Sequence, residues 1–105
     1  MALDELRLAA DLDPDRARYV YVYAVALHSA GRGGEAMTIL KKSLVQHPND
    51  RDSLVAAINF SRDAGDFKTA LEYAEQLAEV VPDDSSVAAV VDGLRRQAIS
   101  PTGAR

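Results

Sequence analysis

Apolar residues recur at intervals of three and four along most of the chain, which is the spacing of one face of an α-helix. Val20, Tyr23, Ala24 and Leu27 follow this spacing, for example. Glycines and prolines separate the periodic segments, and both residues are typical of helix ends and turns. The pattern therefore predicts an all-α protein. Its predicted helices cover about residues 2–12, 16–30, 34–46, 51–64, 67–80 and 84–98.

An internal repeat organises these helices. The stretch AGRGGEAM at residues 30–37 returns as AGDFKTAL at residues 64–71, which places equivalent glycines and alanines 34 residues apart. The prolines Pro14, Pro48 and Pro82 keep the same distance from one another. A fixed period of this length indicates stacked copies of one helix–turn–helix unit.

The stretch YVYVY at residues 19–23 is the one segment with the character of a strand, because aromatic and β-branched residues alternate in it. The alternation lasts only five residues, and the following AVALHSA returns to helical spacing. The equivalent segment of the next repeat, residues 51–64, does not alternate. We therefore predict a helix here too.

Residues at the ends of the predicted helices fit their positions. Gly31 and Gly65 each follow the first helix of a repeat, where glycine can adopt the left-handed conformation that ends a helix. Asp15, Asn49 and Asp83 each follow a proline of the repeat, and we predict that they cap the next helix, at about 1 kcal/mol each.

The period and the repeated spacing of small and apolar positions resemble the tetratricopeptide repeat, whose pattern is W-x₂-L-G-x₂-Y…A-x₃-F…P. The first full repeat would cover residues 17–50, and the second would cover residues 51–84. The residues at pattern positions are Val20, Tyr23, Ala24, Leu27, Ala36, Leu40 and Pro48 in the first repeat, and Leu54, Ala57, Ile58, Ser61, Ala70, Ala74 and Pro82 in the second.

This resemblance implies an α-solenoid of antiparallel helix pairs, formed as a single domain by residues 1–98. Besides the two full repeats, residues 1–14 match the second half of a repeat. The last helix has an apolar stripe on one side and polar residues on the other, as expected of the end of an array. We expect a half-repeat at residues 1–14, a capping helix at residues 85–98 and a disordered tail at residues 99–105.

The sequence offers no arrangement typical of an enzyme or a metal site. It contains no cysteine, which excludes disulfides, thiolate metal sites and covalent haem attachment within these 105 residues. His28 and His47 are too far apart for the usual metal-binding spacing of three to five residues. GRGG lacks the strand before it and the Lys-Ser/Thr after it that a phosphate loop needs. We therefore expect no catalytic activity, no cofactor and no metal.

The family resemblance implies a peptide-binding groove, because the first helices of successive tetratricopeptide repeats line a concave surface. The mixture of an aromatic residue, small apolar residues and arginines there suits an extended acidic or apolar peptide. The alternative is that these side chains are only the solvated faces of helices. The predicted groove residues are Arg18, Tyr21, Val25, His28, Asp52, Val55, Asn59, Arg62, Asp63 and Arg96, with Val22, Ser29, Ala56, Ala89 and Gly93 beside them.

Other classes of partner are not expected. With 12 basic and 16 acidic residues and a net charge of −4, the chain lacks the basic surface of a general nucleic-acid or anionic-membrane binder. No apolar run approaches the length of a membrane span, so we expect a soluble protein. The carboxylate clamp of chaperone-binding family members is also absent, since its positions read Tyr21, Val25, Ala56, Ser86 and Val90.

The first predicted helix suggests a second function. It has more leucines than a helix packed on one side needs, namely Leu3, Leu6, Leu8 and Leu12. Either the chain is the end of a longer array, which we favour, or two copies cover each other as a homodimer through residues 2–12. In the second case the chain would be a structural segment that self-associates.

A narrower resemblance concerns RYVYVYAVALHSAGR, HPNDRDSL and the later PDD, within about residues 10–90. These stretches look like the C-terminal tetratricopeptide arrays of bacterial multihaem cytochrome c proteins of the nitrite-reductase-like type. The resemblance implies a docking module of an exported bacterial protein and thus a periplasmic location. The cytoplasm stays open as the alternative.

Overall fold

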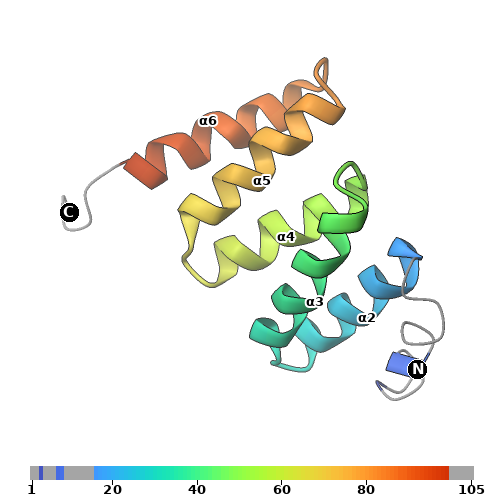
Figure 1. Cartoon of the computed structure of the whole chain (residues 1–105). Helices are drawn as coiled ribbons and strands as arrows, with labels where there is room; N and C mark the ends of the chain where they lie inside the picture. The colour runs from blue at the N-terminus through green and yellow to red at the C-terminus, as the bar shows by residue number, and fades with distance from the viewer. Residues whose placement is uncertain (1–2, 4–6, 9–15, 100–105) are drawn as a thin grey trace.

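The computed structural model describes Leu3, Arg7, Leu8 and residues 16–99 (Figure 1). This part of the chain is all-helical and contains no strand, which confirms the predicted all-α class. Each helix after residue 16 begins and ends within one residue of its predicted bounds. These helices are α2 (Ala17–Ser29), α3 (Gly33–Gln46), α4 (Arg51–Asp63), α5 (Phe67–Val80) and α6 (Ser85–Ile99).

The two ends of the chain are covered only in part. Leu3, Arg7 and Leu8 are helical, but the rest of the predicted helix at 2–12 lies outside the described residues. Ile99 is the last residue of α6, so the prediction that a tail begins there is wrong by one residue. Pro101 disfavours the helical conformation at the residue directly before it, and Ile99 lies one residue further upstream. The remainder of the predicted tail, residues 100–105, is outside the described part.

The stretch YVYVY is helical, as predicted, and lies within α2. Val20, Ala24 and Leu27 form the buried stripe of this helix. Their spacing of four and three residues places all three on one face. The strand-like alternation is therefore overridden by the helical spacing of the residues that enter the core.

Consecutive helices form hairpins that follow one another from the N-terminal to the C-terminal end (Figure 1). α2 packs on α3, α4 packs on α5, and α6 packs on α5. The hairpins are joined because α4 also contacts both α2 and α3. The far end is different, since α6 contacts α5 but has no close backbone contact with α4.

The core consists largely of alanine and leucine at repeated positions. Ala24, Ala36, Ala57, Ala70 and Ala74 are completely buried. Alanine at such positions lets two helix backbones approach closely, and a larger side chain would separate them. The larger buried side chains around them include Leu27, Leu40, Leu44, Leu54, Ile58, Phe60, Leu77, Val91 and Leu94.

Gly31 and Gly65 end α2 and α4 as predicted. They are the only positive-φ residues in the described part of the chain, at 81° and 77°. In the first turn, the Arg32 N–H donates to the Leu27 carbonyl at 2.9 Å. In the second turn, the Asp66 N–H donates to the Ser61 carbonyl, also at 2.9 Å. This is the Schellman motif, which satisfies carbonyl groups at the end of a helix.

The predicted N-caps Asn49 and Asp83 are wrong by one residue. The side chain of Asp50 caps α4 by accepting a hydrogen bond from the Ser53 N–H at 3.0 Å. The side chain of Asp84 accepts from the backbone N–H of Val87 in the same way, at 3.3 Å, and also from that of Ser86, at 2.8 Å. In α4 and in α6, the cap is therefore the second residue after the proline that precedes the helix.

A β-turn explains this offset. The Asp50 N–H donates to the His47 carbonyl at 3.2 Å, which places Pro48 at the second position of a turn. The turn at residues 81–84 has the same bond, at 3.1 Å. Proline favours that position because its φ is fixed, so one further residue is needed before the helix can begin. Asp15, the third predicted cap, lies outside the described residues.

The two repeats differ in how their helices begin. Asp66 caps α5 by accepting from the Thr69 N–H at 3.2 Å, and hydrogen bonding to Thr69 lowers the pKa of the Asp66 carboxyl. Arg16 and Arg32 occupy the equivalent positions before α2 and α3, and neither makes a side-chain cap bond. Arg32 instead pairs with Glu35 at 2.8 Å. The second repeat thus has capping interactions that the first lacks.

Replacing Gly31 or Gly65 by alanine should lower the free energy of unfolding by about 1–2 kcal/mol, because a Cβ is strained in the left-handed conformation. Crowding is not the cause, since a Cβ at either position would meet no heavy atom within 4 Å. Chemical denaturation followed by far-UV circular dichroism measures the loss.

Gly34→Ala is the matched control, because Gly34 is also uncrowded but has no positive φ. It lies in the first turn of α3, where alanine should leave stability unchanged or raise it by up to about 1 kcal/mol. Equal losses at Gly31, Gly34 and Gly65 would contradict the assigned role of the two turn glycines.

Candidate binding groove

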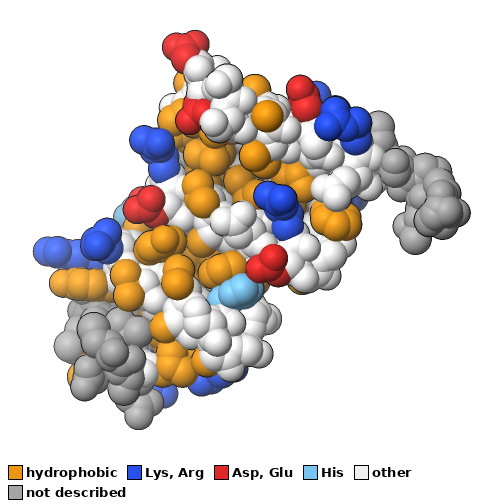
Figure 2. All heavy atoms as spheres, turned by 180° about the vertical axis from the view of Figure 1, so that it is seen from behind, with side chains coloured by type: hydrophobic (Ala, Val, Ile, Leu, Met, Phe, Trp, Pro, Cys, Tyr) orange, Lys and Arg blue, Asp and Glu red, His pale blue; other side chains and the backbone are white. Residues whose placement is uncertain are grey.

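The predicted groove residues lie on α2, α4 and α6, and none of them is buried. Tyr21 and His28 are half-buried, and the other eight are exposed. Figure 2 views the molecule from behind and shows hydrophobic side chains gathered along one face, with Lys, Arg, Asp and Glu side chains spaced among them. Such a face combines apolar contact area with separate charges.

Ala56 is a wrong assignment, because only 5% of it is exposed and it belongs to the core. The reason is the central place of α4, which packs against α2, α3 and α5 at once. A larger part of its circumference is therefore buried than on α2. The repeat position alone could not show this, since it treats each first helix as having the same neighbours.

A cavity of about 150 Å³ between α4 and α6 brings three predicted residues together: Val55, Asn59 and Arg62. We call this cavity the α4–α6 cleft. It exists because α6 rests on α5 without closing against α4. Its other lining residues are Ile58 from α4, Ala74 and Leu77 from α5, and Ser86, Val87 and Val90 from α6.

The floor of the α4–α6 cleft was not predicted. Ala74 and Leu77 come from α5, a second helix of a repeat, and groove residues were expected only from first helices. Both are buried and apolar, so the signal available in the sequence was their place on the core stripe of α5. They reach the cleft only because α6 leaves α4 uncovered at this end.

A second cavity, of about 270 Å³, continues along α6. It shares Arg62 and Val90 with the α4–α6 cleft, so these two side chains lie between the two hollows. Ala89 and Gly93, which were placed beside the groove, line this second cavity. Leu94 and Gln97 complete its lining.

His28 and Asp63 come together at a different place. The His28 ring stacks on the Phe60 ring, with centroids 4.1 Å apart and planes 3° apart. His28 Nε2 lies 3.3 Å from Asp63 Oδ2. Since His28 belongs to α2 and its two partners belong to α4, these contacts join the two hairpins.

The glycine-rich turn opens a cavity beside this contact. Gly31, Gly33 and Gly34 line it together with His28, Met37, Phe60, Asp63 and Ala64, and its volume is about 340 Å³. Gly31 is required by its positive φ, but Gly33 and Gly34 are helical and leave space simply because they have no side chain. The glycines thus shape the surface as well as the turn.

The remaining predicted residues are not gathered into any of these three cavities. None of the three cavities is lined by Arg18, Tyr21, Val25, Asp52 or Arg96. Among the described residues, no cluster of three or more His, Cys, Asp or Glu side chains could hold a metal ion. The predicted groove residues are thus divided between separate cavities and other parts of the surface.

No protein-family model matches this chain, and no curated protein matches it either. Within the described residues, none of the helices is both long enough and apolar enough to span a bilayer.

The contact between His28 and Asp63 should be weak but measurable. A double-mutant cycle of His28→Ala and Asp63→Ala, followed by urea denaturation, should give a coupling energy of about 0.2–1 kcal/mol. The value is small because the two side chains are 31% and 63% exposed, and solvent screens the pair.

The control cycle combines His28→Ala with Asp52→Ala. Asp52 is exposed on the same helix as Asp63 but about 16 Å away along its axis. Those two changes should add independently. A coupling between His28 and Asp63 no larger than this control would show that the pair does not form in solution.

Proposed function

We propose that this chain is a tetratricopeptide-repeat-like α-solenoid whose groove binds an extended segment of another protein. The α4–α6 cleft carries this proposal, because it is an apolar hollow on the surface between the first helix of the second repeat and the last helix. Apolar clefts with a few polar groups at the rim are typical of binding sites. The partner we propose is a protein or peptide, and the chain itself has no catalytic role.

The repeat assignment is supported by burial. Apart from Tyr23 and the two prolines, every residue at a pattern position is buried, and these positions come from both 34-residue units. The same Schellman turn also ends α2 and α4. Equivalent residues therefore perform equivalent packing roles in both units, as expected of a repeat array.

The parent protein and its location are part of the same proposal. On its resemblance to multihaem cytochrome arrays, the chain would be a docking module of an exported bacterial protein, located in the periplasm. A cytoplasmic location is the alternative. The absence of cysteine is compatible with either redox environment.

A second candidate function is self-association through residues 2–12. One observation favours it, because the side chain of Leu8 is 57% exposed. An exposed leucine beside other apolar residues can be covered by a second copy. If the chain self-associates, its molecular mass in sedimentation experiments should rise with protein concentration. The mass should fall in the Leu8→Gln variant.

Peptide binding can be tested by selecting displayed peptides on the full chain. Selected peptides should lose binding to a variant with Arg18→Glu, Arg62→Glu and Arg96→Glu. All three arginines are exposed, so the free energy of unfolding should change by only about 0.5 kcal/mol for each. Binding to the original chain should also weaken with salt, because arginines would meet an acidic segment.

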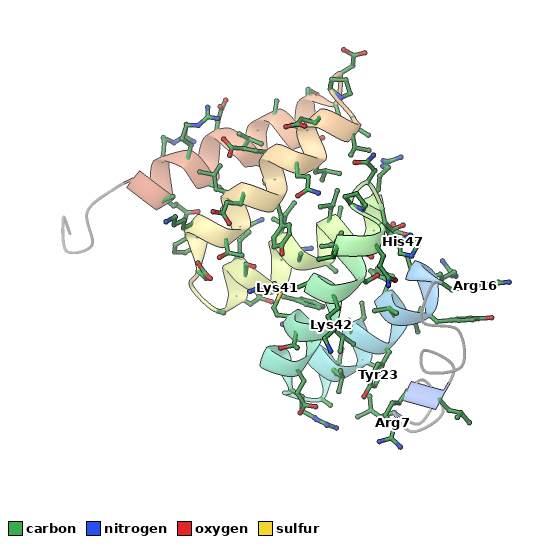
Figure 3. All side chains as sticks on the ribbon, in the orientation of Figure 1. Arg7, Arg16, Tyr23, Lys41, Lys42 and His47 are labelled. Carbon is green, nitrogen blue, oxygen red and sulfur yellow. The ribbon has the colours of Figure 1, made fainter. Side chains whose placement is uncertain are left out.

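The matched control reverses three lysines that line none of the cavities, in a variant with Lys41→Glu, Lys42→Glu and Lys68→Glu. Figure 3 shows Lys41 and Lys42 projecting from α3. This variant has the same net charge as the arginine variant, so it should keep its peptides if the groove binds them. Loss of binding in the lysine variant alone would contradict the proposal.

A further inference from the structure

We infer that the α4–α6 cleft takes one branched apolar side chain of an extended segment, and that Arg62 binds an acidic side chain of the same segment. This conclusion rests on the proposed function and specifies the chemistry of its partner. It depends on three features of the described residues: the apolar lining of the cleft, the lack of side-chain partners of Arg62, and the absence of carboxylates from the lining of the cleft and the adjoining cavity.

The lining of the cleft suits an aliphatic side chain. Ala74 and Leu77 form a buried apolar floor, and Val55, Val87 and Val90 stand around it. A cavity of about 150 Å³ with aliphatic walls is large enough for a benzene molecule, so Leu, Ile or Val fits. Filling it removes both this lining and the entering side chain from water.

Arg62 supplies the charge. It lines both the cleft and the adjoining cavity, and it is exposed. Among the described residues, it takes part in none of the salt bridges and side-chain hydrogen bonds. Its neighbour Asp63 pairs with His28 instead. The Arg62 guanidinium is thus available for a carboxylate, which it can bind through two parallel hydrogen bonds.

The polar groups around Arg62 point to the same ligand. The other polar residues that line the two cavities are Asn59, Ser86 and Gln97, and all three are neutral. No carboxylate lines either cavity, although acidic residues outnumber basic ones in the chain. An acidic segment therefore meets attraction and no direct repulsion here, whereas a basic segment would face Arg62.

The two anchors are expected two residues apart. Side chains i and i+2 of an extended segment lie on the same side, separated by about 7 Å along the chain. Val90 and Arg62 line both cavities, so the apolar and the charged contacts adjoin each other. The segment we expect has the form Leu-x-Asp or Leu-x-Glu, and Asn59 can hydrogen-bond its backbone.

Nuclear magnetic resonance titration of the full chain tests this directly, because it detects weak binding and locates it. The first probe is a capped octapeptide with Leu and Asp two positions apart among Ala, Gly and Ser. The second probe carries Lys in place of Asp, and the third carries Ala in place of Leu. We expect the first to shift the amide signals of Val55, Asn59, Arg62 and Val90, and the other two to bind at least tenfold more weakly.

Two exposed substitutions separate the two anchors. Arg62→Gln should bring the affinities of the Asp and Lys probes within about twofold of each other. Val55→Ser should lower the affinity for the first probe, which carries both Leu and Asp. The controls are Arg51→Gln and Val45→Ser, since both residues are exposed, lie outside the predicted groove and line neither cavity, so these changes should leave probe binding unaltered. Circular dichroism melts of all four variants should confirm that each is folded.

The outcomes distinguish this inference from the proposed function. If displayed peptides bind the groove but shift α2 signals, or if the Asp and Lys probes bind equally, the cleft assignment is wrong while peptide binding stands. If no probe shifts any groove signal at millimolar concentration, the assignment is also wrong. Signals of cleft residues that change on dilution without any probe would show that a second copy of the chain is the occupant.

Discussion

The close approach of helices at buried alanines is the constraint on which the other features of this protein depend. Ala36 and Ala70 are completely buried at equivalent positions of the two repeats, and Ala24, Ala57 and Ala74 are buried with them. Small side chains bring the backbones together, and leucines fill the space around these contacts. The chain can then build a core with few aromatic residues, and its surface residues are positioned by packed helix pairs.

The two repeats share this packing but differ in their turns and helix caps. Both use a glycine at positive φ to end the first helix, but only the second repeat has aspartates that cap its helices. The first has arginines there and a run of glycines that opens a cavity beside His28. The stack of His28 on Phe60 joins the two hairpins at that place. The more strongly capped repeat is also the one that forms the α4–α6 cleft.

The cleft follows from the way the last helix packs. α6 forms a hairpin with α5 and buries Val91 and Leu94, but it does not close against α4. The floor supplied by α5 therefore stays accessible between the two helices. In the proposed function, the apolar lining would supply contact area and Arg62 would supply one charge, which together would favour an acidic, apolar segment.

The sequence by itself determined the helices and their ends, because the signals for these are local. Helical spacing and the 34-residue period placed each described helix within one residue, and Gly31 and Gly65 marked their turns. The caps were misplaced because a β-turn adds a residue after each proline. Only the tertiary structure decided that Ala56 is buried, that His28 stacks on Phe60 and that Val55, Asn59 and Arg62 share a cleft with α5. These features depend on distances between helices that are far apart in sequence, and such distances are set by the packing of several side chains at once.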